Sequence, residues 1–410
     1  MEKKILIVGG GAAGIMAAIK AAEKSKVYLF EKMSRLGLKI LISGKGRCNV
    51  TNAGPIDQLI KAFGRNGRFL HHAFYAFSNE DLIKFLGEIG VRTKTERGGR
   101  VFPVSNHSKD ILDALKMELE RRNVTVKEKT SVKDLIIVNH KVKGIALKSN
   151  EKMFGDAVIL ATGGKSFPGL GTTGDGFDML AKTGHTIQSL YPALVPLVVE
   201  EKWVRELEGL SLKNVRVSVS VGKKKFSHFG DMVFTKQGIS GPIILSISSE
   251  IVPSLTKPLP FEIDLKPALD EKVLDKRLLK DFAKYSNKEY KNSLSDLLPR
   301  SFIPIFVSLT GIVPNKKCNE LTREDRKKVL HLLKHFPLTI TGTEGFAHAV
   351  VTKGGVLLKE VDPKTMQSKL IKNLYITGEL LDLDGITGGY NLQAAFSTGF
   401  VAGFFASNNP

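Results

Sequence analysis

The sequence predicts an α/β protein whose discontinuous α/β domain is interrupted by an inserted antiparallel β-barrel and a helical module. Three observations predict this fold. A β-α-β pattern opens the chain, with strands expected at 5–8 and 26–30 around an alanine-rich helix at 12–24. Apolar residues alternate through about 190–265, with Pro and Gly at the breaks, which is typical of an antiparallel sheet or barrel. From about residue 344 the strand-and-glycine pattern of the N-terminal part returns.

The remaining elements follow from the same periodicities. They are, in order, helices at 79–90 and 109–122, two or three strands at 125–147, a buried strand at 157–161, helices within 270–335, a buried strand at 374–377 and a closing helix at 393–405. The chain therefore divides into an α/β part (1–190), a barrel-like substrate domain (191–270), a helical part of the insert (271–344) and the second α/β part (345–410).

Composition excludes a disordered chain, a collagen and a disulfide scaffold, because 42% of the 410 residues are hydrophobic and 25% are charged. Lys and Arg exceed Asp and Glu by 61 to 41, giving a formal charge of +20. This excess favours polyanionic partners such as nucleic acid, acidic lipid or a phosphorylated cofactor. Cys48 and Cys318 build no disulfide framework, so a reducing cytoplasm is the expected location. No apolar run reaches the roughly 18–20 residues of a membrane span.

A glycine motif joins the first strand to the first helix. Gly9 permits a tight turn, Gly11 lets the backbone approach a pyrophosphate, and Gly14 lets the helix pack close to the sheet. Glu31 ends the second strand, where it is expected to accept hydrogen bonds from a ribose diol. The pattern predicts a Rossmann-like dinucleotide site. A similar glycine spacing at 169–174 follows no strand and is interpreted as a loop, so one dinucleotide-binding unit is expected.

Later segments favour FAD over NAD. The expected strand at 157–161 ends in Thr-Gly-Gly, and small residues there allow a flat cofactor to lie close to the backbone. The strand at 374–377 is followed by Gly378-Glu379, and 388–393 leads into the last helix. The N-terminus of that helix would direct N–H groups at the N1/C2=O edge of an isoalloxazine, which becomes negative on reduction.

With these motifs the chain resembles the BaiN-like (YhiN-like) family of bacterial FAD-dependent oxidoreductases, related in fold to glutathione-reductase and fumarate-reductase flavoproteins. The resemblance covers nearly the full length. Its blocks are 9–14 with 30–32, 37–52, 99–103, 161–164, 173–176, 234–242, 351–356 and 377–393, of which 43–52 is the most diagnostic. It implies an FAD domain with an inserted barrel and helical module. One departure is Lys236, where relatives often have His, and no role of that His is transferred.

The glycine motif and the resemblance together imply a set of FAD contacts. The loop at 39–52 would lie along the pyrophosphate and towards the flavin, where basic groups would offset phosphate charge. The backbone of a strand near Val132 would contact the adenine. The expected residues are Gly9, Gly11, Ala13, Gly14, Glu31, Lys32, Lys39, Ser43, Gly44, Gly46, Arg47, Cys48, Asn49, Val132, Ala161, Thr162, Gly163, Gly378, Glu379, Asp384, Gly385, Gly389, Asn391, Leu392 and Gln393.

No catalytic side chain is assigned, because the flavin would carry the chemistry. Cys48 is a candidate redox partner or nucleophile, or else a small packing residue, since no second Cys is close in sequence. Arg100 and His348 are candidates for holding a substrate carboxylate or carbonyl, or else structural or FAD-facing residues. The pair His71-His72 lacks metal-ligand spacing, and no metal site is expected.

Three functions remain open. The first is an FAD-dependent oxidoreductase that moves a hydride between flavin and a small organic substrate, by enone reduction or amine oxidation as the resemblance implies, with NAD(P)H or O₂ as second substrate. The second is a flavin-dependent tRNA-modifying enzyme, favoured by the +20 charge and by basic runs at 223–225 and 326–328. These runs lack the interleaved aromatic residues that stack on bases. The alternative interpretation is that they are solvent-exposed surfaces with no partner. The third is a non-enzymatic, flavin-bound redox sensor or binding protein. The oligomeric state is left open.

Overall fold

The computed structural model describes residues 2–408. The chain forms two units. Unit 1 combines the residues up to Ala193 with those from Phe346 onward, and unit 2 is Leu194–Gly345. Each unit has a hydrophobic core of its own.

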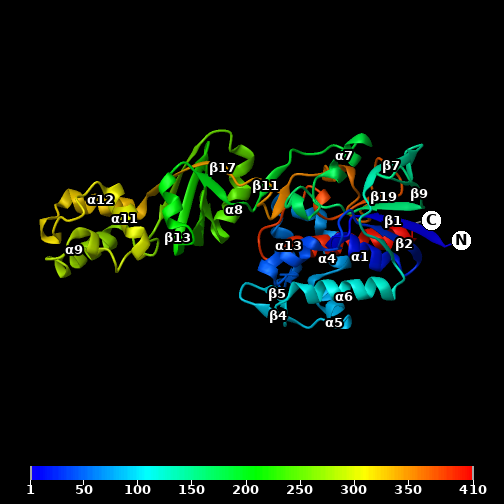
Figure 1. The fold of residues 1–410 in the computed structure, drawn as a ribbon, viewed down its shortest axis with the longest axis horizontal. Helices are drawn as coiled ribbons and strands as arrows, with labels where there is room; N and C mark the ends of the chain where they lie inside the picture. Colours follow the sequence, from blue (N-terminus) through cyan, green and yellow to red (C-terminus); the bar gives the residue numbers. More distant parts are fainter. Residues whose placement is uncertain (1, 409–410) are drawn as a thin grey trace. The chain divides into compact units, whose positions relative to one another are not determined.

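A five-stranded parallel sheet lies at the centre of unit 1 (Figure 1). Strand β1 (Lys3–Val8) is central, because β2 (Ser25–Phe30) pairs with one of its edges and β10 (Ala157–Leu160) with the other. Strands β6 (Thr125–Lys127) and β19 (Leu374–Ile376) complete the order β19-β10-β1-β2-β6. The apolar end of β1 is buried on both faces, as expected for a parallel strand covered on both sides.

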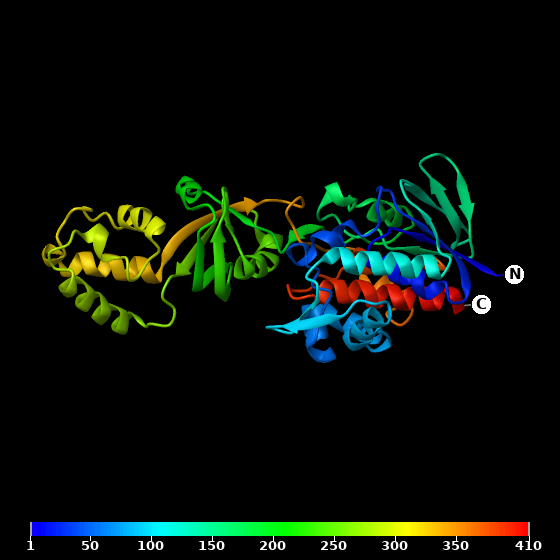
Figure 2. The same cartoon turned by 60° about the horizontal axis from the view of Figure 1, so that its bottom comes forward.

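Three helices lie side by side in unit 1 (Figure 2). Helices α1 (Ala12–Ala21) and α13 (Tyr390–Asn408) pack against the sheet, and α6 (Ser108–Arg121) lies next to α1. The backbones of α1 and α13 touch, since a Cβ on Gly399 would stand 2.2 Å from the carbonyl oxygen of Ala13. An antiparallel sheet of β7 (Val132–Val138), β8 (Lys141–Leu147) and β9 (Lys152–Phe154) packs on β10 through β8.

The other elements of unit 1 are short and surround this core. They are α2 (Leu38–Ile42), β3 (Thr51–Asn52), α3 (Ile56–Lys61), α4 (His71–Ala76), α5 (Asn79–Glu88), β4 (Thr93–Glu96), β5 (Arg100–Pro103), α7 (Asp175–Lys182), β11 (Tyr191–Ala193) and β18 (Val351–Lys353). Strands β3, β5 and β4 form one small antiparallel sheet. Strand β11, where the chain leaves unit 1, pairs with β18, shortly after it returns.

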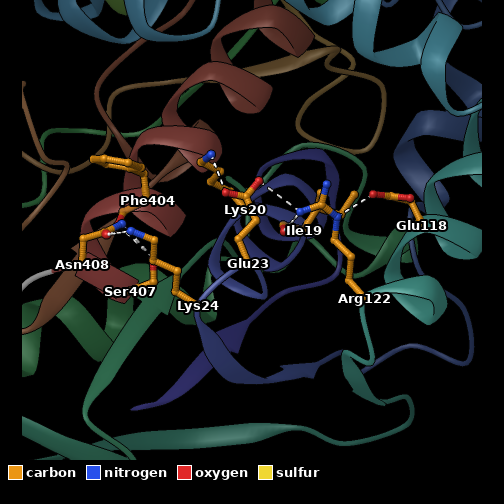
Figure 3. A network of polar contacts seen from close by, with 9 residues as sticks. All are labelled: Ile19, Lys20, Glu23, Lys24, Glu118, Arg122, Phe404, Ser407 and Asn408. Carbon is orange, nitrogen blue, oxygen red and sulfur yellow. Dashed lines mark hydrogen bonds and ion pairs between the residues drawn. The ribbon is translucent and has the colours of Figure 1, made fainter. Parts of the chain in front are cut away.

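A network of hydrogen bonds and ion pairs connects the end of α6 to α1 (Figure 3). The guanidinium of Arg122 donates to the carboxylate of Glu118, to the carbonyl oxygen of Ile19 at 3.1 Å and to Glu23 at 3.1 Å. Glu118 is 5% exposed, although it is charged. Hydrogen bonds from Arg121 and then from Arg122 lower the pKa of Glu118 to about 2, against the opposing effect of burial.

Unit 2 consists of a closed antiparallel barrel and a group of helices. The barrel contains, in spatial order, β12 (Leu197–Val199), β15 (Gly238–Ser240), β14 (Lys224–Phe234), β13 (Ser211–Val221), β16 (Leu259–Asp264) and β17 (Phe336–Thr343). Its helices are α8 (Pro242–Ile251), α9 (Glu271–Lys284), α10 (Tyr290–Ser293), α11 (Ile303–Thr310) and α12 (Arg323–Lys334).

The predicted fold class is confirmed by the parallel sheet and the inserted antiparallel barrel. One assignment is wrong in part, because β17 is a barrel strand although 271–344 was expected to be helical. Its side chains alternate, with Phe336, Leu338 and Ile340 buried, but this short pattern directly follows a long helical one. The interval expected to be strands also contains α8, which begins at a proline.

Helix boundaries differ from expectation at both ends of the chain. Helix α1 ends at Ala21, three residues early, because the chain must turn before β2 begins at Ser25. Helix α13 begins at Tyr390, three residues before the expected position, and continues to Asn408. Among residues 2–408, no helix combines the length and the apolar character needed to cross a bilayer.

Candidate functional site

A cavity opens at the carboxyl ends of four parallel strands in unit 1. It encloses about 1210 Å³, counting its open mouth. Gly9 follows β1, Glu31 follows β2, Ala161 follows β10 and Gly378 lies just beyond β19, and all four line the cavity. This edge of an open α/β sheet is where such folds bind ligands.

Many of the residues expected to contact the cofactor line this cavity. They are Gly9, Gly11, Ala13, Glu31, Lys39, Ser43, Ala161, Thr162, Gly163, Gly378, Glu379, Asn391 and Leu392. They come from both ends of the chain, so folding brings together segments separated by more than 300 residues in sequence.

The three glycines of the first turn have three different roles. Gly9 has φ +104°, and a Cβ there would stand 2.4 Å from the carbonyl oxygen of Ala161. A Cβ on Gly14 would stand 1.8 Å from the carbonyl oxygen of Gly9, so this glycine allows α1 to pack on the turn. Gly11 has no protein atom within 4 Å of its Cβ position, which leaves open space before the N-terminus of α1. No side chain caps that helix, so its first N–H groups remain available to an anion.

Glu31 is held in place by the backbone at the end of β2. Its carboxylate accepts hydrogen bonds from the N–H groups of Gly10 and Met33, each at 2.8 Å. A carboxylate accepts about four hydrogen bonds, so Glu31 retains capacity for a ribose diol. A second cavity of about 400 Å³ shares Gly9 and Glu31 with the first. It is lined by Lys32, an expected cofactor contact, and by Val132, which was expected to contact the adenine.

The chemistry of these walls fits a bound dinucleotide. The Oγ1 atom of Thr162 is buried and has no hydrogen-bond partner in the chain, and this residue lines both cavities. A buried hydroxyl without a partner is costly, and a ligand can supply the missing bond. Together with the open space at Gly11 and the uncapped N-terminus of α1, Thr162 identifies a site suited to FAD.

The charge of Lys39 is matched within the cavity wall. Its Nζ donates to Glu379 at 2.8 Å and to the hydroxyl of Ser166 at 2.8 Å. Glu379 also accepts from the backbone N–H of Thr352 at 2.7 Å. Arg47, the other cation expected to offset phosphate charge, pairs with Glu96 and does not line the cavity. Both cations are thus paired within the chain.

Ten of the expected contact residues lie outside the lining of both cavities. These residues are Gly14, Gly44, Gly46, Arg47, Cys48, Asn49, Asp384, Gly385, Gly389 and Gln393. Gln393 is fully buried, where it accepts from Thr51 and donates to Ser397. The side chain of Asn391 exchanges two hydrogen bonds with the backbone of Gly385, which fixes the first turn of α13 beside the cavity.

Several lining residues were not anticipated. They are Gly10, Ala12, Arg35, Gly37, Leu38, Ile40, Phe63, Leu170, Gly171, Thr172, Val350, Val351, Leu383, Ala394, Ala395 and Thr398. The last three continue the helical face that begins at Asn391, so a correct start for α13 would have revealed them. Leu170 to Thr172 belong to the loop with the second glycine spacing, which contributes to this cavity.

The three catalytic candidates lie in different environments. Cys48 is completely buried, and burial raises the pKa of its thiol to about 11, although a hydrogen bond with Ser43 opposes this shift. Arg100 is exposed on β5, where its Nε donates to the carbonyl oxygen of Arg97. His348 is exposed two residues before Val350, which lines the cavity. No group of three metal-ligating side chains occurs within 2–408.

A Cys48→Ser variant is expected to undergo flavin reduction and reoxidation at the wild-type rates. The reason is that a thiol with a pKa near 11 is protonated at neutral pH and does not reach the cavity. Stopped-flow measurement of both half-reactions checks this, with Cys318→Ser as the matched control. A loss of rate in Cys48→Ser alone would restore Cys48 as a reacting group.

The chain is similar to several known proteins over nearly its whole length. A family model described as the HI0933-like protein Rossmann domain matches residues 3–405. A Clostridium scindens protein named 3-dehydro-bile acid delta(4,6)-reductase is 34% identical, over 99% of this chain and 100% of its own length. A Haemophilus influenzae protein named ribosomal RNA dihydrouridine synthase is 31% identical, over 97% of this chain and 96% of its own length.

Solved structures share the fold at lower sequence identity. The open conformation of a flavocytochrome c3 fumarate reductase matches with a TM-score of 0.54 at 17% identity, over 99% of this chain and 78% of that one. The 3-ketosteroid delta1-dehydrogenase from Sterolibacterium denitrificans matches with a TM-score of 0.54 at 14% identity, over the whole of both chains.

Proposed function

The chain belongs to the HI0933-like Rossmann family and is an FAD-dependent oxidoreductase, and on this premise we propose that it reduces a carbon–carbon double bond conjugated to a carbonyl group. The observation that carries the proposal is the cavity at the carboxyl ends of β1, β2, β10 and β19, with its open phosphate position at Gly11. Bound FAD would supply a hydride for such a reduction from N5 of its ring.

The names of the relatives support this reaction class. A delta(4,6)-reductase saturates double bonds of a 3-dehydro bile acid, in which a ketone stands in place of a hydroxyl. Dihydrouridine has two hydrogens more than uridine, whose ring double bond is conjugated to a carbonyl. Both reactions add hydrogen to an electron-poor carbon–carbon double bond, so one arrangement of cofactor and protein could serve either class of acceptor.

The side chains around the cavity would then have distinct tasks. Glu31 would orient the ribose, and the N-terminus of α1 would hold the pyrophosphate. The first turn of α13 borders the cavity at Asn391 and Leu392, so the positive end of its dipole would stabilise negative charge at that end of the site. The apolar groups of Phe63, Leu383 and Leu392 would exclude water there.

The excess of Lys and Arg favours RNA as a second acceptor class, because polyanions bind basic proteins. The basic runs noted in the sequence contribute unequally to this excess. Arg326 pairs with Asp275 at 2.7 Å and Lys327 with Glu324 at 3.1 Å, whereas Lys224 and Lys225 on β14 are exposed. The RNA named for the relative is ribosomal, so ribosomal rather than transfer RNA is the substrate to test.

Anaerobic mixing of the FAD-loaded protein tests the proposed reaction. NADH or NADPH is expected to bleach the visible flavin absorbance, and a conjugated enone or uridine-containing ribosomal RNA is expected to restore it. A saturated ketone of matched size is the control and should leave the flavin reduced. Failure of both nucleotides to bleach the flavin, or failure of every unsaturated acceptor to restore its colour, would overturn the proposal. If amines alone bleach the flavin, the protein would oxidise an amine instead of reducing an unsaturated acceptor.

A further inference from the structure

A cluster of cations lies on the hairpin of β4 and β5, outside the cavity. The hairpin pairs Lys94 with Phe102 and Glu96 with Arg100, so these four side chains share one face. The guanidinium of Arg47 lies 4.0 Å from the centroid of the Phe102 ring and therefore joins the same face. Figures 1 and 2 show this hairpin projecting from the α/β unit. We call Arg47, Lys94, Arg97 and Arg100 the basic hairpin.

The acid on this face does not neutralise the basic hairpin. Glu96 accepts a hydrogen bond from Arg47 and is 3.9 Å from the Nζ of Lys94, so one carboxylate is shared by two cations. Arg97 and Arg100 form no ion pair with any residue in 2–408, and both are exposed. The face therefore carries net positive charge, with at least two guanidinium groups available to a partner.

The hairpin is fixed next to the cavity through Asn52. The Nδ2 of Asn52 donates to the carbonyl oxygen of Gly98 at 2.9 Å, in the turn between β4 and β5. It also donates to the carbonyl oxygen of Gly388 at 3.2 Å, just before α13. The first turn of α13 lines the cavity at Asn391 and Leu392. The basic hairpin is thus attached to the α13 end of the cavity rather than to the ribose end at Glu31.

We infer that the basic hairpin binds the sugar-phosphate backbone of an RNA substrate beside the cavity. The inference rests on the proposed reduction of an unsaturated ring and assigns its substrate class. Arg97 and Arg100 do not line the cavity. A small acceptor enclosed in the cavity would therefore not contact them. Phosphates repeat along an RNA strand, and guanidinium groups bind them bidentately. Phe102 is buried beneath Arg47, so it offers no free ring for base stacking, and the contact is electrostatic.

The test compares two double variants of the FAD-loaded protein. Arg97→Gln/Arg100→Gln removes two charges from the basic hairpin, and Lys224→Gln/Lys225→Gln removes two exposed charges from unit 2 as the matched control. The probe is a fluorescein-labelled oligouridylate, titrated at several salt concentrations. The hairpin variant is expected to raise Kd about tenfold and to reduce the slope of log K against log salt by about 1.4, because each lost phosphate contact to a single strand removes about 0.7. The control variant is expected to leave the slope near the wild-type value.

Flavin bleaching by NAD(P)H and reoxidation by a small enone are measured on the same samples, and both should be unchanged in the hairpin variant. Equal weakening of RNA binding in both double variants would overturn the inference, as would absence of oligouridylate binding at low salt. A rise in KM for NADPH without a change in RNA binding would also overturn it, by assigning the hairpin to the nucleotide phosphate. In each of these cases the flavin measurements still test the proposed reaction separately.

Discussion

Replacing Gly11 with valine is expected to give a folded protein that purifies without FAD. The backbone of Gly11 has φ −83° and ψ −172°, an extended conformation that valine adopts without strain. Apart from its chain neighbours, no protein atom lies within 4 Å of its Cβ position, so an added Cβ would meet no other part of the chain. It would instead occupy the space where the pyrophosphate approaches the N-terminus of α1. We expect FAD affinity to fall by at least about 100-fold, equivalent to ~2.7 kcal/mol.

Flavin absorbance after purification and titration with added FAD measure this loss. The melting temperature of the FAD-free protein should stay close to that of FAD-free wild type. Gly87→Ala is the matched control, because Gly87 on α5 also has no atom within 4 Å of its Cβ position but does not line the cavity. A Gly11→Val protein that binds FAD with wild-type affinity would show that the phosphates lie elsewhere.

Replacing Glu118 with glutamine is expected to destabilise unit 1 by about 2–3 kcal/mol at neutral pH. The change leaves the guanidinium of Arg122, which is 21% exposed, without its carboxylate partner on α6. Hydrogen bonds from Arg121 and Arg122 hold the pKa of Glu118 at about 2, below its usual value of 4.5. A lowered pKa means that the stabilisation is complete above the unfolded-state pKa and is lost as pH falls through the folded-state value. The difference between the two proteins should therefore shrink from about pH 4.5 down to about pH 2.

Urea unfolding, monitored by the circular dichroism of the helices, measures this difference in the free energy of unfolding. The single tryptophan, Trp203, lies in unit 2, so its fluorescence would not report on α6. The control is Glu88→Gln on α5, since Glu88 is 4.0 Å from Lys84 in an exposed pair. Such pairs contribute about 0–1 kcal/mol. An equal loss in both variants, or a loss that does not change with pH, would contradict the assigned role of Glu118.

The part of the site that could be predicted is the part set by local chain geometry. The turn from β1 to α1 needs glycine at Gly9 and Gly14 because a Cβ there would collide with neighbouring carbonyl oxygens, and the spacing of the motif reports this need directly. Glu31 could be placed because it ends a strand of recognisable pattern. The parallel sheet followed from short apolar runs that bury both faces.

The part that could not be predicted depends on contacts between distant segments. Lys39 was expected to balance phosphate charge, but Glu379, 340 positions later, pairs with it in the folded chain. Cys48 was a candidate nucleophile or else a packing residue, and only the folded chain shows that burial raises the pKa of its thiol. Strand β17 was not predicted because helices α9 to α12 separate it in sequence from its barrel partners, β12 and β16. Neither burial nor strand partners can be seen in a local sequence window.

The route of the chain through unit 1 also sets the order in which the protein can mature during synthesis. Strand β1, the glycine turn and β2 leave the ribosome first, but β19 and α13 follow only after all of unit 2. Those late elements supply one edge of the sheet and the cavity wall at Gly378 and Asn391. At translation rates of about 5–20 residues per second, the segment that ends at Ala193 waits roughly 10–40 s until Asn408 has been made. The complete cavity can therefore form only after the residues of α13 have been made.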